Sequence, residues 1–293
     1  MTNFYNEIAS NKRKSYLLIT LFIITIIFFS YIIGAVFLGN IYAGIFIGFI
    51  ISMIFTLIGY YSGDSLILQV SGAIPATKQE YPYLINTVEG LSIAAGIPIP
   101  KVYIIHDENP NAFATGRDEK HASITATTGL LKIMNRSELE GVIGHEMSHI
   151  KNYDVRFMTF VSIFAGVLVL LIYFFLRGFF YGGSRNRDEN PGVVFLVVGL
   201  ILAILTPILV QLIKLAISRK REFLADASGA ELTKYPPGLA SALKKLRDYK
   251  GSELKTASKA TAHLFINNPF GKVSNWFSTH PDINLRIKKL EEM

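Results

Sequence analysis

Four long apolar runs constrain the fold of this 293-residue chain more than any other feature. They extend from Tyr16 to Leu38, from Ile41 to about Tyr61, from Phe157 to Leu176 and from Val193 to Ile217. Each run is long enough to cross a hydrocarbon core of about 30 Å as a helix. Hydrophobic residues make up 51% of the chain and charged residues only 17%, which is more apolar surface than a compact soluble interior hides. The sequence therefore predicts an integral membrane protein with four transmembrane helices, arranged as two hairpins.

Basic residues predict which side of the membrane each segment occupies. Lys and Arg fill positions 12–14, eight more lie within 62–156, and positions 219–221 hold another three, whereas the turn at 39–40 carries none. By the positive-inside rule, both termini and the segment 62–156 are cytoplasmic, although three Arg in the loop 177–192 weaken the pattern. The net charge of +7 fits a membrane surface, and no basic stripe interleaved with aromatic residues indicates nucleic-acid binding.

The runs divide the chain into two membrane hairpins and two cytoplasmic parts. We expect the boundaries to be 1–61, 62–156, 157–217 and 218–293. In the first cytoplasmic part, Glu80–Ile97 has the periodicity of an amphipathic helix, and 101–107 and 122–131 are rich in β-formers. The segment 109–116 between them is turn-rich and then extended. The prediction is a mostly α protein with a cytoplasmic α+β part that contains a small sheet.

The stretch GHEMSHI places two histidines four residues apart. A capping-box pattern at Ser137 and Glu140 predicts a helix that begins just upstream, so His145 and His149 share one helix face. Two neutral imidazoles can bind one Zn²⁺ there, and Glu146 can take the proton of an attacking water. This is the H-E-x-x-H arrangement. The alternative is a solvated helix whose histidines have no chemical role.

A catalytic zinc ion usually has three protein ligands. The chain contains no cysteine, so the third ligand must be a histidine or a carboxylate. Asp154 is close in sequence but lies five residues past His149, which turns it off the motif's face of a helix. In the stretch REFLAD, Glu222 can ligate, and Asp226 one turn later can accept the N–H of a ligand histidine. Two predicted crossings separate this stretch from the first motif, so the two lie on the same side of the membrane.

These motifs together resemble the HtpX-type membrane zinc endopeptidases, which belong with the gluzincins and are related to the CAAX prenyl proteases. The resemblance covers nearly the whole chain, through two spans, PNAFATG, GHEMSHI, two further spans, REFLAD and FSTHP. It implies a zincin-like fold for the cytoplasmic part and one zinc ion bound by His145, His149 and Glu222. It also implies that Glu146 is the general base.

The same resemblance implies where the substrate binds. It places an edge strand beside the substrate, formed by Asn111, Ala112, Phe113 and Ala114. It also places two further catalytic residues, His280 and Arg286, close to the reacting carbonyl. The competing interpretation of this last stretch is a helix start in which Arg286 is a solvated residue.

The resemblance predicts a zinc-dependent endopeptidase that cleaves peptide bonds of misfolded or membrane proteins at the cytoplasmic surface of the cell membrane.

 The resemblance implies a role in the quality control of such proteins, with the lipid bilayer and polypeptide substrates as the partners. Two alternatives stay open. A CAAX-type prenyl-protein protease would need a chamber for a lipidated peptide, for which four spans are few. A catalytically idle membrane protein would keep the metal as a structural clip, but closed structural sites use four protein ligands and only three are found here.

Overall fold

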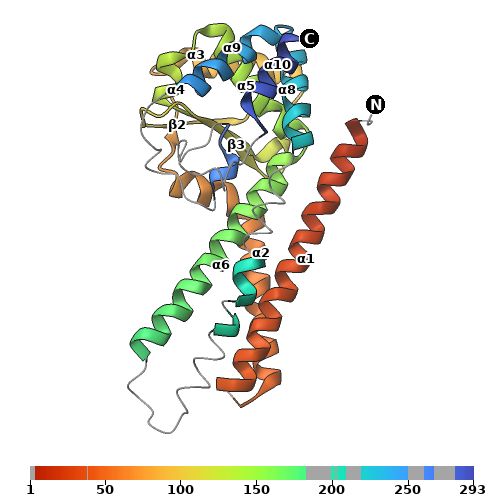
Figure 1. The fold of residues 1–293 in the computed structure, drawn as a ribbon, viewed down its shortest axis with the longest axis vertical. Helices are drawn as coiled ribbons and strands as arrows, with labels where there is room; N and C mark the ends of the chain where they lie inside the picture. Colours follow the sequence, from red (N-terminus) through yellow and green to blue (C-terminus); the bar gives the residue numbers. More distant parts are fainter. Residues whose placement is uncertain are drawn as a thin grey trace.

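The computed structural model describes residues 4–37, 39–182, 199–201, 203–208, 219–249, 261–266 and 281–293 (Figure 1). Three long helices run side by side away from a head that holds the sheet and the shorter helices. They are α1 (Phe4–Phe37), α2 (Ile41–Val70) and α6 (Asp154–Gly182). The chain is mostly helical with one small mixed sheet, as the sequence predicts.

The first two helices form a closely packed hairpin. Asn40 caps the start of α2, because its side chain accepts a hydrogen bond from the backbone N–H of Ala43. A Cβ atom added to Gly34 would lie 2.6 Å from the Cα of Gly44, so this approach requires glycine. The helix α2 continues past Tyr61, the predicted end of the hairpin, to Val70.

Two of the described helices are long and apolar enough to cross a membrane. They are Ile8–Ile32 within α1 and the whole of α2, with mean hydropathies of 2.3 and 2.4. A third span is present if α5 (Arg136–Lys151) and the start of α6, which meet at 83°, count as one bent span. The run from Val193 to Ile217 lies mostly outside the described residues, so four spans stay a prediction.

The sheet of the head has four strands in the order β1-β2-β4-β3. The strands are β1 (Ile74–Pro75), β2 (Lys101–Ile105), β3 (Ala112–Gly116) and β4 (Ala122–Thr127). Strand β2 is parallel to β4, and β3 is antiparallel to β4 with Ala114 opposite Ile124. Strand β3 is therefore an edge strand of the described sheet. The predicted strand 122–131 ends early because Thr127 caps α4 (Thr128–Ile133) by accepting the N–H of Leu130.

The remaining helices of the head are α3 (Pro82–Ala95), α8 (Arg219–Thr233), α9 (Pro236–Asp248) and α10 (Ile283–Glu291), with two short 3₁₀ turns, η1 (Glu119–His121) and η2 (Ala262–Leu264). Three of these helices pack against α5, and the fourth, α10, packs against α8 and α9. The helix α5 contacts α3, α8, α9 and the sheet, and most of its length from Leu139 to Ile150 is buried. Its central position fixes the two histidines of the H-E-x-x-H motif in the interior of the head.

The capping box predicted at Ser137 and Glu140 is wrong by two residues. Asn135 is the N-cap of α5, and its side chain accepts the N–H of Glu138, whose carboxylate accepts the N–H of Asn135 in return. Glu138 also accepts hydrogen bonds from Ser241 and Lys245 of α9, at 2.7 and 2.6 Å. These contacts select the earlier start, because Glu138 is buried, whereas Glu140 is half-buried and pairs with the exposed Arg136.

Candidate metal centre

Three potential metal ligands meet between α5 and α8. His145 and His149 project from the same face of α5, and their Nε2 atoms are 3.2 Å apart. Glu222 enters from α8, with one carboxylate oxygen 3.7 Å from His145 Nε2 and the other 3.6 Å from His149 Nε2. All three side chains are buried. The structure thus brings together two segments that are far apart in the sequence, as a shared metal site requires.

Two glycines allow α5 and α8 to pack this closely. A Cβ atom on Gly229 would lie 2.7 Å from the backbone nitrogen of His145, and one on Gly144 would lie 3.1 Å from the carbonyl oxygen of Gly229. Gly229 is two helical turns after Glu222, on the same face of α8. The close crossing therefore sets the distance between Glu222 and the two histidines.

Each of the two histidines is oriented by a carboxylate on the other side of its ring. Asp226 Oδ1 is 2.9 Å from His145 Nδ1, and Asp154 Oδ2 is 2.9 Å from His149 Nδ1. Hydrogen bonds from Nδ1 to carboxylates fix the tautomer, so that both Nε2 atoms direct their lone pairs at the cluster. This arrangement is typical of histidines that bind a metal.

The donor set fits a zinc ion. Four tetrahedral bonds of about 2.0–2.1 Å place the ligand atoms about 3.4 Å from one another. The separations of 3.2, 3.6 and 3.7 Å among His145, His149 and Glu222 lie close to that value. Without a cation, two nitrogen lone pairs and a carboxylate at these distances would repel one another. Three protein ligands leave the fourth position of a tetrahedral site for water or substrate.

The charges around the cluster favour a positive ion at its centre. Burial by itself lowers the pKa of His149, but the hydrogen bond to Asp154 and the negative charges of Glu222, Asp154 and Glu146 outweigh it and raise the pKa to about 9. Burial also raises the pKa of Glu146, which is only 2% exposed. The positive charges of His145, His149 and Arg286 oppose this rise, and the negative charge of Glu222 adds to it. Glu146 is thus a stronger base than an exposed glutamate.

Arg286 is part of the support of the centre. It is 1% exposed, so the interpretation of Arg286 as a solvated helix residue is wrong. Its Nε and Nη2 atoms donate to both oxygens of Asp226 at 2.8 and 2.7 Å, and its Nη1 atom lies 3.6 Å from Glu222. Burial would raise the pKa of Asp226, but Arg286 and the hydrogen bond from His145 hold it well below its usual range. The contacts of Arg286 describe a residue that positions Asp226 and His145.

Asp154 has a role that its spacing does not predict. The helix α5 ends at Lys151, Tyr153 adopts a left-handed conformation with φ of 60°, and α6 begins at Asp154. This turn brings the carboxylate back to Nδ1 of His149. Asp154 is therefore wrong as an alternative zinc ligand, because it contacts the ring nitrogen that faces away from the cluster.

The other predicted site residues lie in two places. Asn111 directly precedes β3 and the next three residues begin it; all four are buried. The carbonyl of Ala112 accepts the backbone N–H of Ile266 at 3.0 Å. Part of the edge that was predicted to bind substrate is thus paired within the chain. His280 lies outside the described residues, so its predicted catalytic role is untested.

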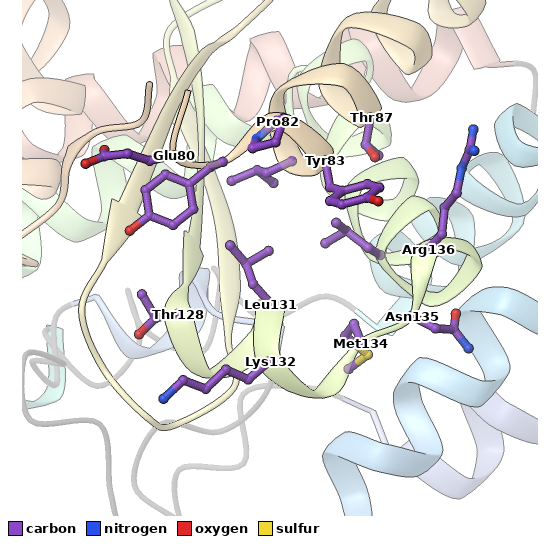
Figure 2. A pocket seen from close by; sticks show the side chains of 13 residues that line it. Glu80, Pro82, Tyr83, Thr87, Thr128, Leu131, Lys132, Met134, Asn135 and Arg136 are labelled. Atoms are coloured by element: carbon purple, nitrogen blue, oxygen red, sulfur yellow. The ribbon is translucent and has the colours of Figure 1, made fainter. Parts of the chain in front are cut away.

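A cavity of about 770 Å³ lies apart from these residues, between α3, α4 and the start of α5 (Figure 2). Pro82, Leu131 and Met134 line it, and Lys132 and Arg136 lie on opposite sides of it. Its lining includes none of the candidate ligands, and His145 is more than two helical turns farther along α5 than Arg136. We therefore assign the chemistry to the buried cluster and not to this cavity.

Comparison with known proteins identifies the family. The model of peptidase family M48 matches residues 78–293, which include both motif helices and Arg286. The chain belongs to peptidase family M48. This M48 peptidase is 49% identical over 293 residues to a protease HtpX homolog of Caldanaerobacter subterraneus, covering 99% of this chain and 97% of the relative. A protease HtpX homolog of Dictyoglomus turgidum is 48% identical over 296 residues, covering 99% and 95%.

A solved structure is also similar. The crystal structure of S. mikatae Ste24p aligns with a TM-score of 0.49 and 20% identity, covering 99% of this chain and 66% of that one. The family assignment confirms the predicted activity of this M48 peptidase: it is a membrane metalloendopeptidase that hydrolyses peptide bonds. Neither a prenyl-protein protease nor an idle metal protein is favoured by these matches.

Proposed function

We propose that this peptidase uses one zinc ion held by His145, His149 and Glu222. The observation that carries the proposal is the meeting of two imidazole Nε2 atoms, 3.2 Å apart, with a buried carboxylate within 3.7 Å of both. Because both Nδ1 atoms face carboxylates, the lone pairs of neutral imidazoles at both Nε2 atoms point toward Glu222 and toward each other. A cation at this point relieves their repulsion, and two nitrogens with one oxygen are ligands that suit zinc.

Each residue of the centre then has a chemical task. Zinc, when bound, supplies Lewis acidity to the scissile carbonyl and to the attacking water. Glu146 accepts the proton of that water and returns it to the leaving amine. Its raised pKa suits the first transfer, because a stronger base accepts the proton of the water more readily. Arg286 acts through Asp226, while His280 stays a proposed oxyanion donor that rests on the sequence resemblance.

We propose that the substrate backbone pairs with β3 at Ala114. The backbone carbonyl of Asn111 accepts the N–H of Thr127, so alternation along the antiparallel pair turns the N–H and C=O groups of Ala112 and Ala114 away from β4. The carbonyl of Ala112 already accepts the N–H of Ile266, so Ala114 is the residue that we propose for pairing with the substrate. Pairing through the main chain does not read side chains. It suits misfolded and membrane proteins, which share no common sequence.

We also propose four membrane spans with both termini and the active site in the cytoplasm of a cell-membrane protein. The basic residues at 12–14, within 62–156 and at 219–221 support this orientation. Reporter domains fused after Gly72 and after Ser218 should be cytoplasmic, and one inserted at Asn186 should lie outside. A cytoplasmic signal at Asn186 would show that the third and fourth runs do not cross.

Two variants test the catalytic proposal. Glu146→Gln should keep its zinc but lose on the order of 10²–10⁴ in kcat, because an amide cannot take the proton. Glu222→Ala should lose the zinc itself. Both are assayed in detergent, by metal analysis and by cleavage of an unfolded membrane protein, with a prenylated peptide as the comparison substrate. A kcat within tenfold of the parent in Glu146→Gln, or full zinc occupancy in Glu222→Ala, would refute the respective role.

A further inference from the structure

Asn11 lies on the membrane helix α1, yet its side chain forms part of the support of the metal centre. It is 1% exposed, and its Nδ2 atom donates hydrogen bonds to Asp154 Oδ1 at 2.7 Å and to the backbone carbonyl of Asn152 at 3.0 Å. A buried amide that donates both of its protons at these distances holds its acceptors in place. The acceptors here are the residues of the turn between α5 and α6.

Asp154 connects Asn11 to the centre. One of its oxygens accepts from Asn11, and the other lies 2.9 Å from Nδ1 of His149. The carboxylate is therefore fixed at both oxygens and cannot rotate without breaking one contact. Because such outer contacts orient the ring of a ligand histidine, a change at Asn11 reaches the Nε2 atom of His149 through one intermediate residue.

The two ligand histidines are supported in the same way but from different helices. Asp226, which orients His145, is held by the guanidinium of Arg286 on α10. Asp154, which orients His149, is held by the amide of Asn11, with Arg221 Nε farther away at 3.9 Å. A neutral amide fixes the direction of the carboxylate while withdrawing less of its negative charge than an ion pair would. One ligand is thus supported from inside the head and the other from the membrane helix.

The helix α1 is seated against α6 at more than this point. The Nζ atom of Lys12 lies 4.2 Å above the ring of Tyr153, in the same turn, and Phe22 stacks on Phe164 of α6 at 3.9 Å. Figure 1 shows α1 running alongside α2 and α6, with its first turns beside the head. The position of the Asn11 amide therefore depends on how α1 packs along its length.

We infer that Asn11 is a positioning residue of the peptidase. Through Asp154 it sets the orientation of His149, and it thereby couples the seating of the first membrane helix to the affinity for the metal. The inference rests on the proposed function, because it takes His149 as a zinc ligand.

The test measures zinc affinity of the full-length protein in detergent, by competition with a chelator. Asn11→Ala should bind zinc on the order of 10–100-fold more weakly than the parent, the loss typical of an outer contact to a ligand histidine. Asn11→Leu keeps the branched shape of the side chain without a hydrogen-bond donor, so it should show the same loss and carries the test if Asn11→Ala does not fold. The Co²⁺ spectrum of both variants should change as well, which a purely structural role would not cause.

Ser15→Ala is the matched control, one turn along α1. Its hydroxyl is buried and donates only within α1, to the carbonyl of Asn11, so zinc affinity should stay within about threefold of the parent. In an Asp154→Asn background, adding Asn11→Ala should have little further effect, because the intermediate is already altered. A folded Asn11 variant with parental zinc affinity, or an undiminished effect in that background, would overturn the inference. Retention of zinc by His149→Ala would instead refute the proposed ligand set.

Discussion

The crossing of α5 and α8 at Gly229 provides a quantitative test of how the metal centre is built. Gly229→Ala adds one methyl group whose carbon would lie 2.7 Å from the backbone nitrogen of His145. Ordinary van der Waals contact begins at 3.4 Å, so the two helices must separate by about 0.7 Å (3.4 − 2.7) or shift by a similar amount. The obstacle is backbone on both sides, and no side chain can rotate away to relieve it.

That separation is large compared with the tolerance of a metal site. Zinc–ligand distances vary by only about 0.2 Å, and His145 and Glu222 lie on opposite sides of the crossing. We therefore expect zinc affinity to fall at least tenfold, and kcat to fall on the order of 10²-fold as the reacting groups are displaced. Overpacking costs about 1–3 kcal/mol of folding stability, of which the better helix propensity of alanine recovers up to about 1 kcal/mol.

The measurements are zinc affinity by chelator competition, kcat on an unfolded membrane protein, and thermal unfolding in detergent. Gly90→Ala is the matched control, because Gly90 also lies within a helix but a Cβ atom there would meet nothing within 4 Å. That variant should keep full activity and be as stable as the parent or slightly more stable. If Gly229→Ala binds zinc and turns over like Gly90→Ala, the close crossing does not set the ligand geometry.

Three further changes test other parts of the reasoning. Glu138→Gln should destabilise the protein by about 2 kcal/mol, against at most about 0.5 kcal/mol for Glu140→Gln, whose side chain is partly exposed. Equal losses would refute the capping assignment. Burial would raise the pKa of Glu138, but the hydrogen bonds that its carboxylate accepts lower this pKa. The stabilisation of the fold by the Glu138 carboxylate, measured by thermal unfolding, should therefore be lost as the pH falls through the pKa of Glu138 in the folded protein. Ala114→Pro removes an N–H that faces away from β4, so it should raise KM while zinc is retained. Thr115→Pro instead removes a hydrogen bond to β4 and should disrupt the sheet. A normal KM in Ala114→Pro would show that the substrate binds elsewhere. Asp226→Asn should weaken zinc binding about 10–100-fold in a chelator titration, and unchanged affinity would exclude its role.

Local rules predicted several of the elements and the proposed ligands on α5. The β-formers at 101–107 and the periodicity of Glu80–Ile97 predicted β2 and α3 to within a few residues. His145 and His149 lie on one face because four residues make about one turn, and α5 is a regular helix over that interval. The start of α5 was predicted two residues too late, because the capping-box pattern was applied to serine and threonine and passed over Asn135.

Long-range contacts could not be predicted in this way. Arg286 reaches Asp226 from a helix 60 positions later in the sequence, and Asn11 reaches Asp154 from 143 positions earlier. No spacing rule connects such residues, because their approach depends on how whole helices pack. The sequence offered only indirect signs: both are polar residues that lie beside or within amphipathic or apolar helices.

Asp154 shows most clearly where a local rule fails. Five residues after His149 is the wrong face of a continuous helix, and that geometry would exclude any contact. The helix ends at Lys151 instead, and the left-handed Tyr153 turns the chain so that α6 departs at 83°. The bend that interrupts the helix is therefore the feature that brings Asp154 to Nδ1 of His149. A change at Tyr153 that straightened this turn would move Asp154 away from Nδ1 of His149 without replacing any of the three proposed ligands. Such a variant would therefore test the effect of the orientation of His149 while His149 itself is still present.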